Sequence, residues 1–279
     1  MPQKLWFNHP MPNLILIRGG GDLASGVALR LHHAGFDVLI SELPQPLAVR
    51  RAVSFSEAVY EGTWTGENVT SRLIQTPEEL TACLARREIP VLIDPDLALL
   101  SAFPLKPSTI VDARLLKQIA PPLMDSSPFT IGLGPGFVAG KNCHAVIETQ
   151  RGHALGRVYW SGSANADSGQ PEGDPRRVLR APASGTLAGY AQIGEHCEPG
   201  QVIAEVSGEK ISAPFPGVLR GLLHPGLDVK KGLKVGDLDP RNKREYCFLV
   251  SDKSLAIGGG VLEAILRCQR TGILASGEQ

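Results

Sequence analysis

A glycine-rich turn is the group of residues in this sequence that most clearly indicates chemistry. The apolar run Leu14 to Ile17 leads into the segment Arg18 to Gly26, where the glycines and one alanine fit the G-x-G-x-x-A spacing of dinucleotide-binding turns. In that spacing the first glycine permits a tight turn, the second lets the backbone approach a pyrophosphate, and the alanine lets a helix pack closely. The N–H groups of the following helix would bind phosphate. The expected cofactor-binding residues of the turn are Gly19, Gly20, Gly21, Asp22, Ala24 and Ser25.

An acid and two arginines follow the next predicted strand. Glu42 lies 21 residues beyond Gly21, where a carboxylate would accept hydrogen bonds from the ribose hydroxyls of NAD or FAD. The same residue also fits a solvated position at a strand end. Arg50 and Arg51 could bind a phosphate of a substrate, of a cofactor or of a larger pterin nucleotide, or form a solvated basic pair.

A second polar group surrounds the apolar run 145–147. If that run is a strand, His144 and Glu148 share one face of it. Together with His153 they do not supply the three or four converging ligands of a metal site, so no metal site is predicted. Cys143 is expected to be a buried, unreactive thiol, with a nucleophile or sulfur carrier as the alternative. The sequence assigns no role to His144, Glu148 or His153.

Short apolar runs alternate with helical segments in the first part of the chain, which predicts strands buried in a parallel sheet. Further strands are expected at 91–93, 109–111 and 129–133, and a helix at 77–84 with Thr76 as its N-cap. We predict an α/β Rossmann-like parallel sheet domain at 1–125. A connecting α/β segment and linker follows at 126–176, since residues 161–175 are rich in turn-forming types.

A repeat of 32 residues marks the second part of the chain. Seven identities occur at this offset, from the pair Ala181 and Ala213 to the pair Gly200 and Gly232. This pattern resembles the biotinyl/lipoyl-carrier fold, so an all-β biotinyl/lipoyl-like barrel-sandwich unit is predicted at 177–240. Lys210 lacks the methionine neighbours of a carrier lysine, and no lipoyl or biotinyl group is expected on it.

A C-terminal strand and helix, 241–279, are expected to pack back on the core. The three glycines Gly258 to Gly260 before the predicted helix suggest either an anion site or tight packing.

Overall composition limits the possible functions. Lys plus Arg and Asp plus Glu both number 28, so no net charge favours nucleic acid or an anionic membrane. The five scattered cysteines indicate a reducing compartment. The first apolar run is too short for a signal sequence or a membrane span. A cytoplasmic protein is expected, with no prediction of its oligomeric state.

Several longer stretches resemble the YqeB family, whose members are known as selenium-dependent molybdenum hydroxylase system proteins. They are 17–26, 49–51, 55–60, 132–137, 144–149, 151–153, 236–240 and 257–263. The resemblance implies an accessory role in making or loading the molybdenum centre of xanthine-dehydrogenase-like hydroxylases, and it supplies no catalytic residues.

Two functions follow as hypotheses. The first is a maturation factor that binds a nucleotide-containing cofactor, with NAD, FAD and molybdopterin cytidine dinucleotide as the alternatives, and acts with a molybdenum hydroxylase as its partner. The second is an oxidoreductase that uses NAD(P) or FAD. A scaffold with a vestigial nucleotide site is a third, weaker interpretation.

Overall fold

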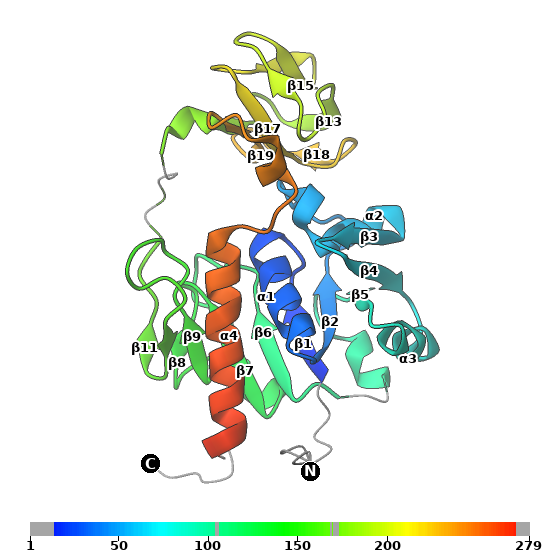
Figure 1. Ribbon diagram of the computed structural model, residues 1–279, viewed down its shortest axis with the longest axis vertical. Coiled ribbons are helices and arrows are strands. Elements are labelled where there is room, and N and C mark those ends of the chain that lie inside the picture. Colours follow the sequence, from blue (N-terminus) through cyan, green and yellow to red (C-terminus); the bar gives the residue numbers. More distant parts are fainter. Residues whose placement is uncertain (1–13, 104–105, 168, 170–172, 272–279) are drawn as a thin grey trace, which may run out of the picture.

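A mixed nine-stranded sheet forms the larger part of the molecule, here called the first unit (Figure 1). The computed structural model describes residues 14–103, 106–167, 169 and 173–271. The strand order is β10-β9-β7-β6-β1-β2-β5-β4-β3, and the central neighbours run parallel. The strands are β1 (Leu14–Arg18), β2 (Asp37–Glu42), β3 (Thr63–Gly66), β4 (Val69–Ile74), β5 (Ile89–Ile93), β6 (Thr109–Asp112), β7 (Phe129–Leu133), β9 (Ala145–Ile147) and β10 (Val158–Tyr159).

Helices cover both faces of this sheet. On one face α1 (Asp22–His33) and α4 (Asp252–Thr271) lie side by side (Figure 1). The other face is covered by α3 (Pro77–Ala85) and a 3-10 turn at Leu99–Ala102. Alternate residues of β1 serve the two cores, because side chains alternate along a strand: Ile15 and Ile17 face α1 and α4, and Leu14 and Leu16 face α3.

Glycines bring α1 and α4 unusually close together. A Cβ on Gly26 would lie 2.5 Å from the Cβ of Ser254, and one on Gly258 would lie 2.8 Å from the carbonyl oxygen of Gly26. A Cβ on Gly260 would collide with the carbonyl oxygen of Gly156. Since α4 begins at Asp252, these glycines lie inside the helix, and the tight-packing interpretation is confirmed for Gly258 and Gly260, while a Cβ on Gly259 would have no atom within 4 Å.

The short elements of the first unit complete its edges. A four-residue helix, α2 (Ala58–Glu61), precedes the β3–β4 hairpin, and β8 (Val138–Ala139) pairs with β11 (Gly162–Ser163). No helix among the described residues is long and apolar enough to cross a membrane.

Two four-stranded antiparallel sheets form the second unit, residues 175–239 (Figure 1). Their orders are β12-β19-β17-β14 and β16-β15-β13-β18. The strands are β12 (Val178–Arg180), β13 (Gly185–Gly189), β14 (His196–Cys197), β15 (Val202–Val206), β16 (Glu209–Ser212), β17 (Gly217–Leu222), β18 (Asp228–Val229) and β19 (Lys234–Asp239).

The 32-residue repeat appears in the strands of the second unit. β13, β14 and β15 recur as β17, β18 and β19 with the same offset. The halves are interleaved, because β14 of the first half pairs with β17 and β18 of the second half pairs with β13. Each half therefore completes the sheet of the other, and both halves share one apolar core.

The predicted fold class, a Rossmann-like parallel sheet followed by a biotinyl/lipoyl-like barrel, is wrong. The large sheet is mixed, since β3 and β10 run antiparallel at its two edges. Several of its connections contain 3-10 turns or short hairpins in place of covering helices. The repeat forms two separate sheets instead of a barrel. Apolar runs and glycine spacing indicated where strands occur, but they carried no information on strand direction or on which sheet a strand joins.

Candidate functional site

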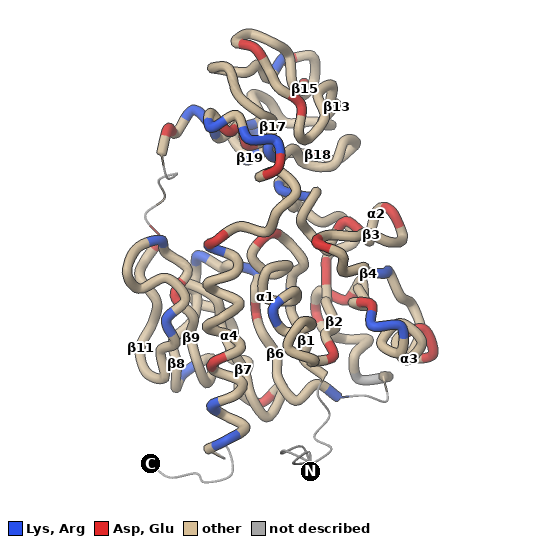
Figure 2. Tube along the Cα trace, viewed as in Figure 1, with Lys and Arg blue, Asp and Glu red and all other residues tan. Residues whose placement is uncertain are grey.

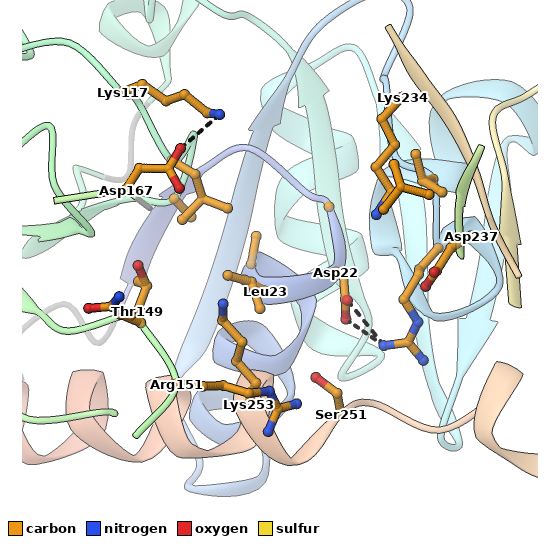
Figure 3. A pocket seen from close by; sticks show the side chains of 18 of the residues that line it. Asp22, Leu23, Lys117, Thr149, Arg151, Asp167, Lys234, Asp237, Ser251 and Lys253 are labelled. Atoms are coloured by element: carbon orange, nitrogen blue, oxygen red, sulfur yellow. Dashed lines mark hydrogen bonds and ion pairs between the residues drawn. The ribbon is translucent and has the colours of Figure 1, made fainter. Parts of the chain in front are cut away.

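A cavity of about 880 Å³ lies between the two units (Figure 3). It is at the edge where the parallel strands β1, β6, β7 and β9 end, which is where ligands bind in open α/β sheets. The lining from the first unit is Gly21, Asp22, Leu23, Ala24, Val49, Arg50, Ala113, Leu115, Lys117, Pro135, Thr149, Gln150, Arg151, Gly152, Asn165, Ala166, Asp167, Ser251 and Lys253. The second unit and its entry contribute Arg177, Val178, Arg220, Lys234 and Asp237.

The lining is strongly cationic. It contains seven Lys or Arg side chains against three Asp side chains, although the whole chain has no net charge. Figure 2 shows Lys and Arg residues of both units near the junction between them. A concave surface with a net charge of one sign concentrates counter-ions, so the net positive charge of the lining favours an anionic ligand.

Two helix N-termini meet at the floor of the cavity. Gly21 is the N-cap of α1, with φ −72° and ψ −172°, and a Cβ there would have no atom within 4 Å. Asp22 in the first turn of α1 accepts hydrogen bonds from Arg50, at 3.0 and 3.1 Å, and from Ser254 Oγ of α4, at 3.0 Å. The positive ends of both helix dipoles therefore face the same region, with the Asp22 carboxylate between them.

The second unit supplies one charged wall. Arg177 binds Asp237 through two hydrogen bonds of 2.9 and 3.0 Å, and Arg220 lies 3.6 Å from the same carboxylate. Burial lowers the pKa of the Arg220 guanidinium, and the neighbouring Arg50 lowers it further. Much of the Lys234 residue is exposed to solvent, but its ammonium group is partly shielded from water. This desolvation lowers the pKa of the ammonium group. A bound anion would relieve this crowding of positive charge.

The first unit supplies the opposite wall. Lys117 pairs with Asp167 at 2.8 Å, and Arg151 pairs with Asp252 at 2.5 and 2.7 Å. Lys253, in the first turn of α4, completes the wall (Figure 3). Within the described part of the chain, neither Lys253 nor Lys234 has a hydrogen-bond or ion-pair partner for its ammonium group.

The predicted glycine turn is present, but its residues have different surroundings. Gly19 has φ +92°, a left-handed conformation that favours glycine, as the tight turn required. The carbonyl oxygen of Gly20 accepts hydrogen bonds from Ser25 Oγ and from Ser56 N. Gly21, Asp22 and Ala24 line the cavity, while Gly19, Gly20 and Ser25 lie behind it.

Glu42 is not among the residues that line the cavity. Its two carboxylate oxygens accept hydrogen bonds from Gly20 N, at 2.6 Å, and from Leu43 N, at 2.7 Å. Burial raises the pKa of the Glu42 carboxyl group, while those hydrogen bonds act in the opposite direction. In this arrangement Glu42 holds the glycine turn to the end of β2.

The two predicted arginines point to different places. Arg50 lines the cavity, and its guanidinium also donates to the carbonyl oxygens of Tyr246 and Leu249. Arg51 donates instead to Leu222 O and to the buried Glu57, both at 2.9 Å, away from the lining. The pair is therefore split between the cavity and the junction of the units.

The polar residues around β9 do not converge. Glu148 is fully buried and accepts hydrogen bonds from Gln150 N and Asn165 N, both at 2.8 Å. His144 contacts Thr130, and His153 is exposed. Burial raises the pKa of the Cys143 thiol to about 12, in agreement with an unreactive thiol.

A further group of possible metal ligands lies at the junction of the units. Glu57, Glu61 and His224 place one carboxylate oxygen or ring nitrogen each within 4.8 Å of one another. Glu57 and Glu61 are four residues apart, but His224 lies far along the chain, so no local spacing links all three. The Arg51 guanidinium is hydrogen-bonded to Glu57, so one of these acids already has a cationic partner.

Sequence reasoning missed most of the cationic residues of the cavity. These are Lys117, Arg151, Arg177, Arg220, Lys234 and Lys253. They come from loops and strands far apart in the chain, and no local spacing links them. Two of the stretches that resemble the YqeB family include residues of the lining outside the glycine turn and Arg50: 151–153 contains Arg151, and 236–240 contains Asp237.

Comparison with known proteins gives one close relative by sequence. The chain is 47% identical over 276 residues to "Uncharacterized protein YqeB" of Escherichia coli (strain K12), which covers 97% of this chain and 51% of that protein. The chain thus spans about half the length of the curated relative it matches, and the match supports the resemblance to the YqeB family. No family model matches the chain.

The similar solved structures are remote. An aspartoacylase family protein from Mesorhizobium loti is 14% identical, with a TM-score of 0.26 and coverage of 81% of this chain and 84% of that chain. The ectoine utilization protein EutE (DoeB) from Ruegeria pomeroyi is 13% identical, with the same TM-score and coverage.

Proposed function

We propose that this chain, a relative of YqeB over half of that protein's length, binds a nucleotide-containing anionic cofactor in the cavity between its two units. The observation that carries the proposal is the cationic lining at the N-termini of α1 and α4. Phosphate groups bind at such positions because backbone N–H groups and the helix dipole both favour negative charge.

The size of the cavity supports a ligand larger than a free phosphate. Its volume of about 880 Å³ is near the upper part of the range for cofactor-sized pockets, roughly 300 to 1,000 Å³. Gly21 leaves open space beside the first turn of α1, so a phosphate could approach the backbone there. A nucleotide joined to a second group, as in NAD, FAD or molybdopterin cytidine dinucleotide, fits these features.

The composition of the lining favours binding over catalysis. Among the described residues that line the cavity there is no histidine and no cysteine, the side chains that most often act as general bases or nucleophiles near neutral pH. We therefore favour an accessory or maturation protein of a xanthine-dehydrogenase-like molybdenum hydroxylase system, as the YqeB resemblance implies. The same proposal includes the selenium dependence of the hydroxylase system, which the family name implies.

The binding proposal is tested on the purified chain. Nucleotide released by heat denaturation would be identified by mass spectrometry, and NAD, FAD and cytidine nucleotides would be titrated by calorimetry. We expect at least one nucleotide to bind, with affinity that falls as salt concentration rises, because the contacts are ionic. If no nucleotide binds at low ionic strength, the proposal is wrong.

The accessory role needs a separate experiment in cells. Deletion of the gene should leave the hydroxylase polypeptide present but inactive, with a low molybdenum content. Normal hydroxylase activity in the deletion strain would contradict the role. Turnover of NAD(P)H or reduced flavin with a small substrate by the purified chain would instead favour the oxidoreductase alternative.

A further inference from the structure

The positive charges of the cavity fall into two groups, one on each wall (Figure 3). We propose that the cavity has two anion subsites that are filled together, one built by the second unit around Lys234 and the other by the start of α4 around Lys253. The ligand would then carry two anionic groups and bridge the units. This inference rests on the proposed function and specifies the class of ligand.

The subsite of the second unit has more positive than negative charge. Arg177, Arg220 and Lys234 line it, and Asp237 is the acid of the same wall. Asp237 is shared by both arginines, which leaves Lys234 without a partner in the described structure. The three cations outnumber the single acid, so this wall keeps a net positive charge and is suited to receive an anion.

The neighbouring acid of β19 does not neutralise this wall. Asp239 is buried and accepts hydrogen bonds from Arg241, which lies outside the lining. Arg220 approaches Asp239 only to 3.9 Å. The two charges of Asp239 and Arg241 largely cancel, so the excess on the wall remains with Arg220 and Lys234.

The subsite at α4 has its own excess of charge. Its other cations are paired, Lys117 with Asp167 and Arg151 with Asp252. Among the described residues Lys253 has no such partner, and it lies in the N-terminal turn of a 20-residue helix, where the dipole adds positive potential. Thr149 and Ser251 supply hydroxyl groups to the same side of the cavity (Figure 3).

A neutral pair separates the two subsites. Asp22 and Arg50 are joined at 3.0 Å, and in Figure 3 the Asp22 carboxylate lies between Lys253 and Lys234. Because Arg50 balances the charge of Asp22, an anion midway between the lysines would gain little attraction from this pair. Two anionic groups, one on each side of the pair, would each lie beside one of the two lysines and compensate both.

The chemistry of the ligand follows from the presence of two separate cationic groups in one cavity. A ligand with a single phosphate or pyrophosphate would fill one subsite. The class that fills both has two anionic groups joined by a neutral segment, such as a dinucleotide that carries an additional phosphate or acidic group. Such a ligand contacts both units at once and would hold them together.

Inorganic pyrophosphate is a probe that does not depend on the identity of the ligand. We expect calorimetry at low ionic strength to find two pyrophosphate ions bound per wild-type chain. Lys234→Ala and Lys253→Ala should each bind one, with the affinity of the lost subsite reduced at least tenfold. Lys210→Ala, which removes a lysine of the β15–β16 hairpin outside the lining, is the matched control and should bind two.

The outcomes separate this inference from the proposed function. One pyrophosphate per wild-type chain, lost in both Lys234→Ala and Lys253→Ala, would mean a single shared site and would overturn the inference while leaving nucleotide binding intact. Binding of one pyrophosphate ion per wild-type chain, lost in Lys253→Ala but kept in Lys234→Ala, would also overturn the inference of two subsites and leave nucleotide binding intact. No pyrophosphate binding at all would overturn both. Thermal unfolding of each variant verifies that it is folded, as expected for lysines without partners.

Discussion

Ser254 Oγ in the first turn of α4 donates a hydrogen bond of 3.0 Å to the carboxylate of Asp22 in the first turn of α1. The two residues lie far apart in the chain, yet they join the N-termini of two helices that run side by side. Helices with neighbouring N-termini repel each other through their dipoles, and one carboxylate between them reduces this repulsion. Asp22 is therefore a structural anion at the floor of a cationic cavity.

Neutralising Asp22 should strengthen anion binding and weaken the fold. In Asp22→Asn the cavity loses one negative charge, so the affinity for pyrophosphate should rise about threefold to tenfold. This corresponds to roughly 1 kcal/mol of binding free energy, the size of a charge–charge interaction at a partly exposed site. Arg50 loses its charged acceptor, which should lower the free energy of unfolding by about 1–2 kcal/mol. Calorimetry and denaturant unfolding measure the two effects. The control is Asp228→Asn, which makes the same charge change at an exposed residue of β18 and should alter the pyrophosphate affinity and the free energy of unfolding less. Weaker pyrophosphate binding by Asp22→Asn would contradict the role of Asp22 as a structural anion.

Gly21 and Gly20 should respond differently to the same substitution. Gly21→Val places its side chain in open space beside the turn, so nucleotide affinity should fall at least tenfold while the free energy of unfolding changes by about 1 kcal/mol or less. In Gly20→Val the new Cβ would lie 3.1 Å from Ser56 N, which should destabilise the fold by about 1–3 kcal/mol. Unchanged nucleotide affinity in folded Gly21→Val would show that no phosphate approaches this turn.

Arg50 and Arg51 should have separable roles. Arg50→Ala exposes the Asp22 carboxylate to the cavity without its cation, so we expect anion affinity to fall at least tenfold. Arg51→Ala leaves the buried Glu57 without its partner, so it should lower the free energy of unfolding by about 3 kcal/mol and leave anion affinity unchanged. Comparable losses of affinity in both folded variants would argue against the separation.

An ion pair at the edge of the first unit should make stability depend on acid pH. Hydrogen bonds from Arg72, at 2.7 and 2.9 Å, and from Arg86 lower the pKa of Glu88 from 4.5 to about 2. Because the folded-state pKa is depressed, this stabilisation is present above about pH 4.5 and is lost as the pH falls toward 2. Arg72→Ala should remove about 1 kcal/mol at pH 7, since solvent screens the partly exposed pair, and less at pH 2.5. Denaturant unfolding at both pH values measures the difference, and an equal loss at both would refute the assignment.

Local sequence signals predicted local structure well. The run Leu14 to Ile17, the glycine turn and the following helix occur where expected, as β1 and α1. The predicted N-cap Thr76 accepts a hydrogen bond from Glu79 N, and the Glu79 carboxylate accepts one from Thr76 N. These features depend on neighbouring residues and on backbone geometry, which a short window of sequence contains.

Long-range relationships explain what the sequence did not predict. The antiparallel direction of β3 depends on a hairpin, and the exchange of β14 and β18 between the repeat halves depends on folding in three dimensions. Glu42 matched the spacing of a ribose-binding acid, but the nearest donors to its carboxylate are Gly20 N and Leu43 N. The cavity wall around Arg220 forms only when the second unit lies against the first.

The contact between α4 and α1 constrains the order in which the molecule can be made. The chain completes the second unit and then returns to the first, where Ile257 and Val261 become fully buried beside α1. A protein is synthesised from its N-terminus, so the apolar face of α1 stays uncovered on the ribosome until residues 252–271 have emerged. The β strands of the second unit, contiguous in the chain, can fold before then. The nascent first unit therefore presents this apolar surface to chaperones from the synthesis of α1 until α4 has emerged, and termination before α4 would leave it exposed.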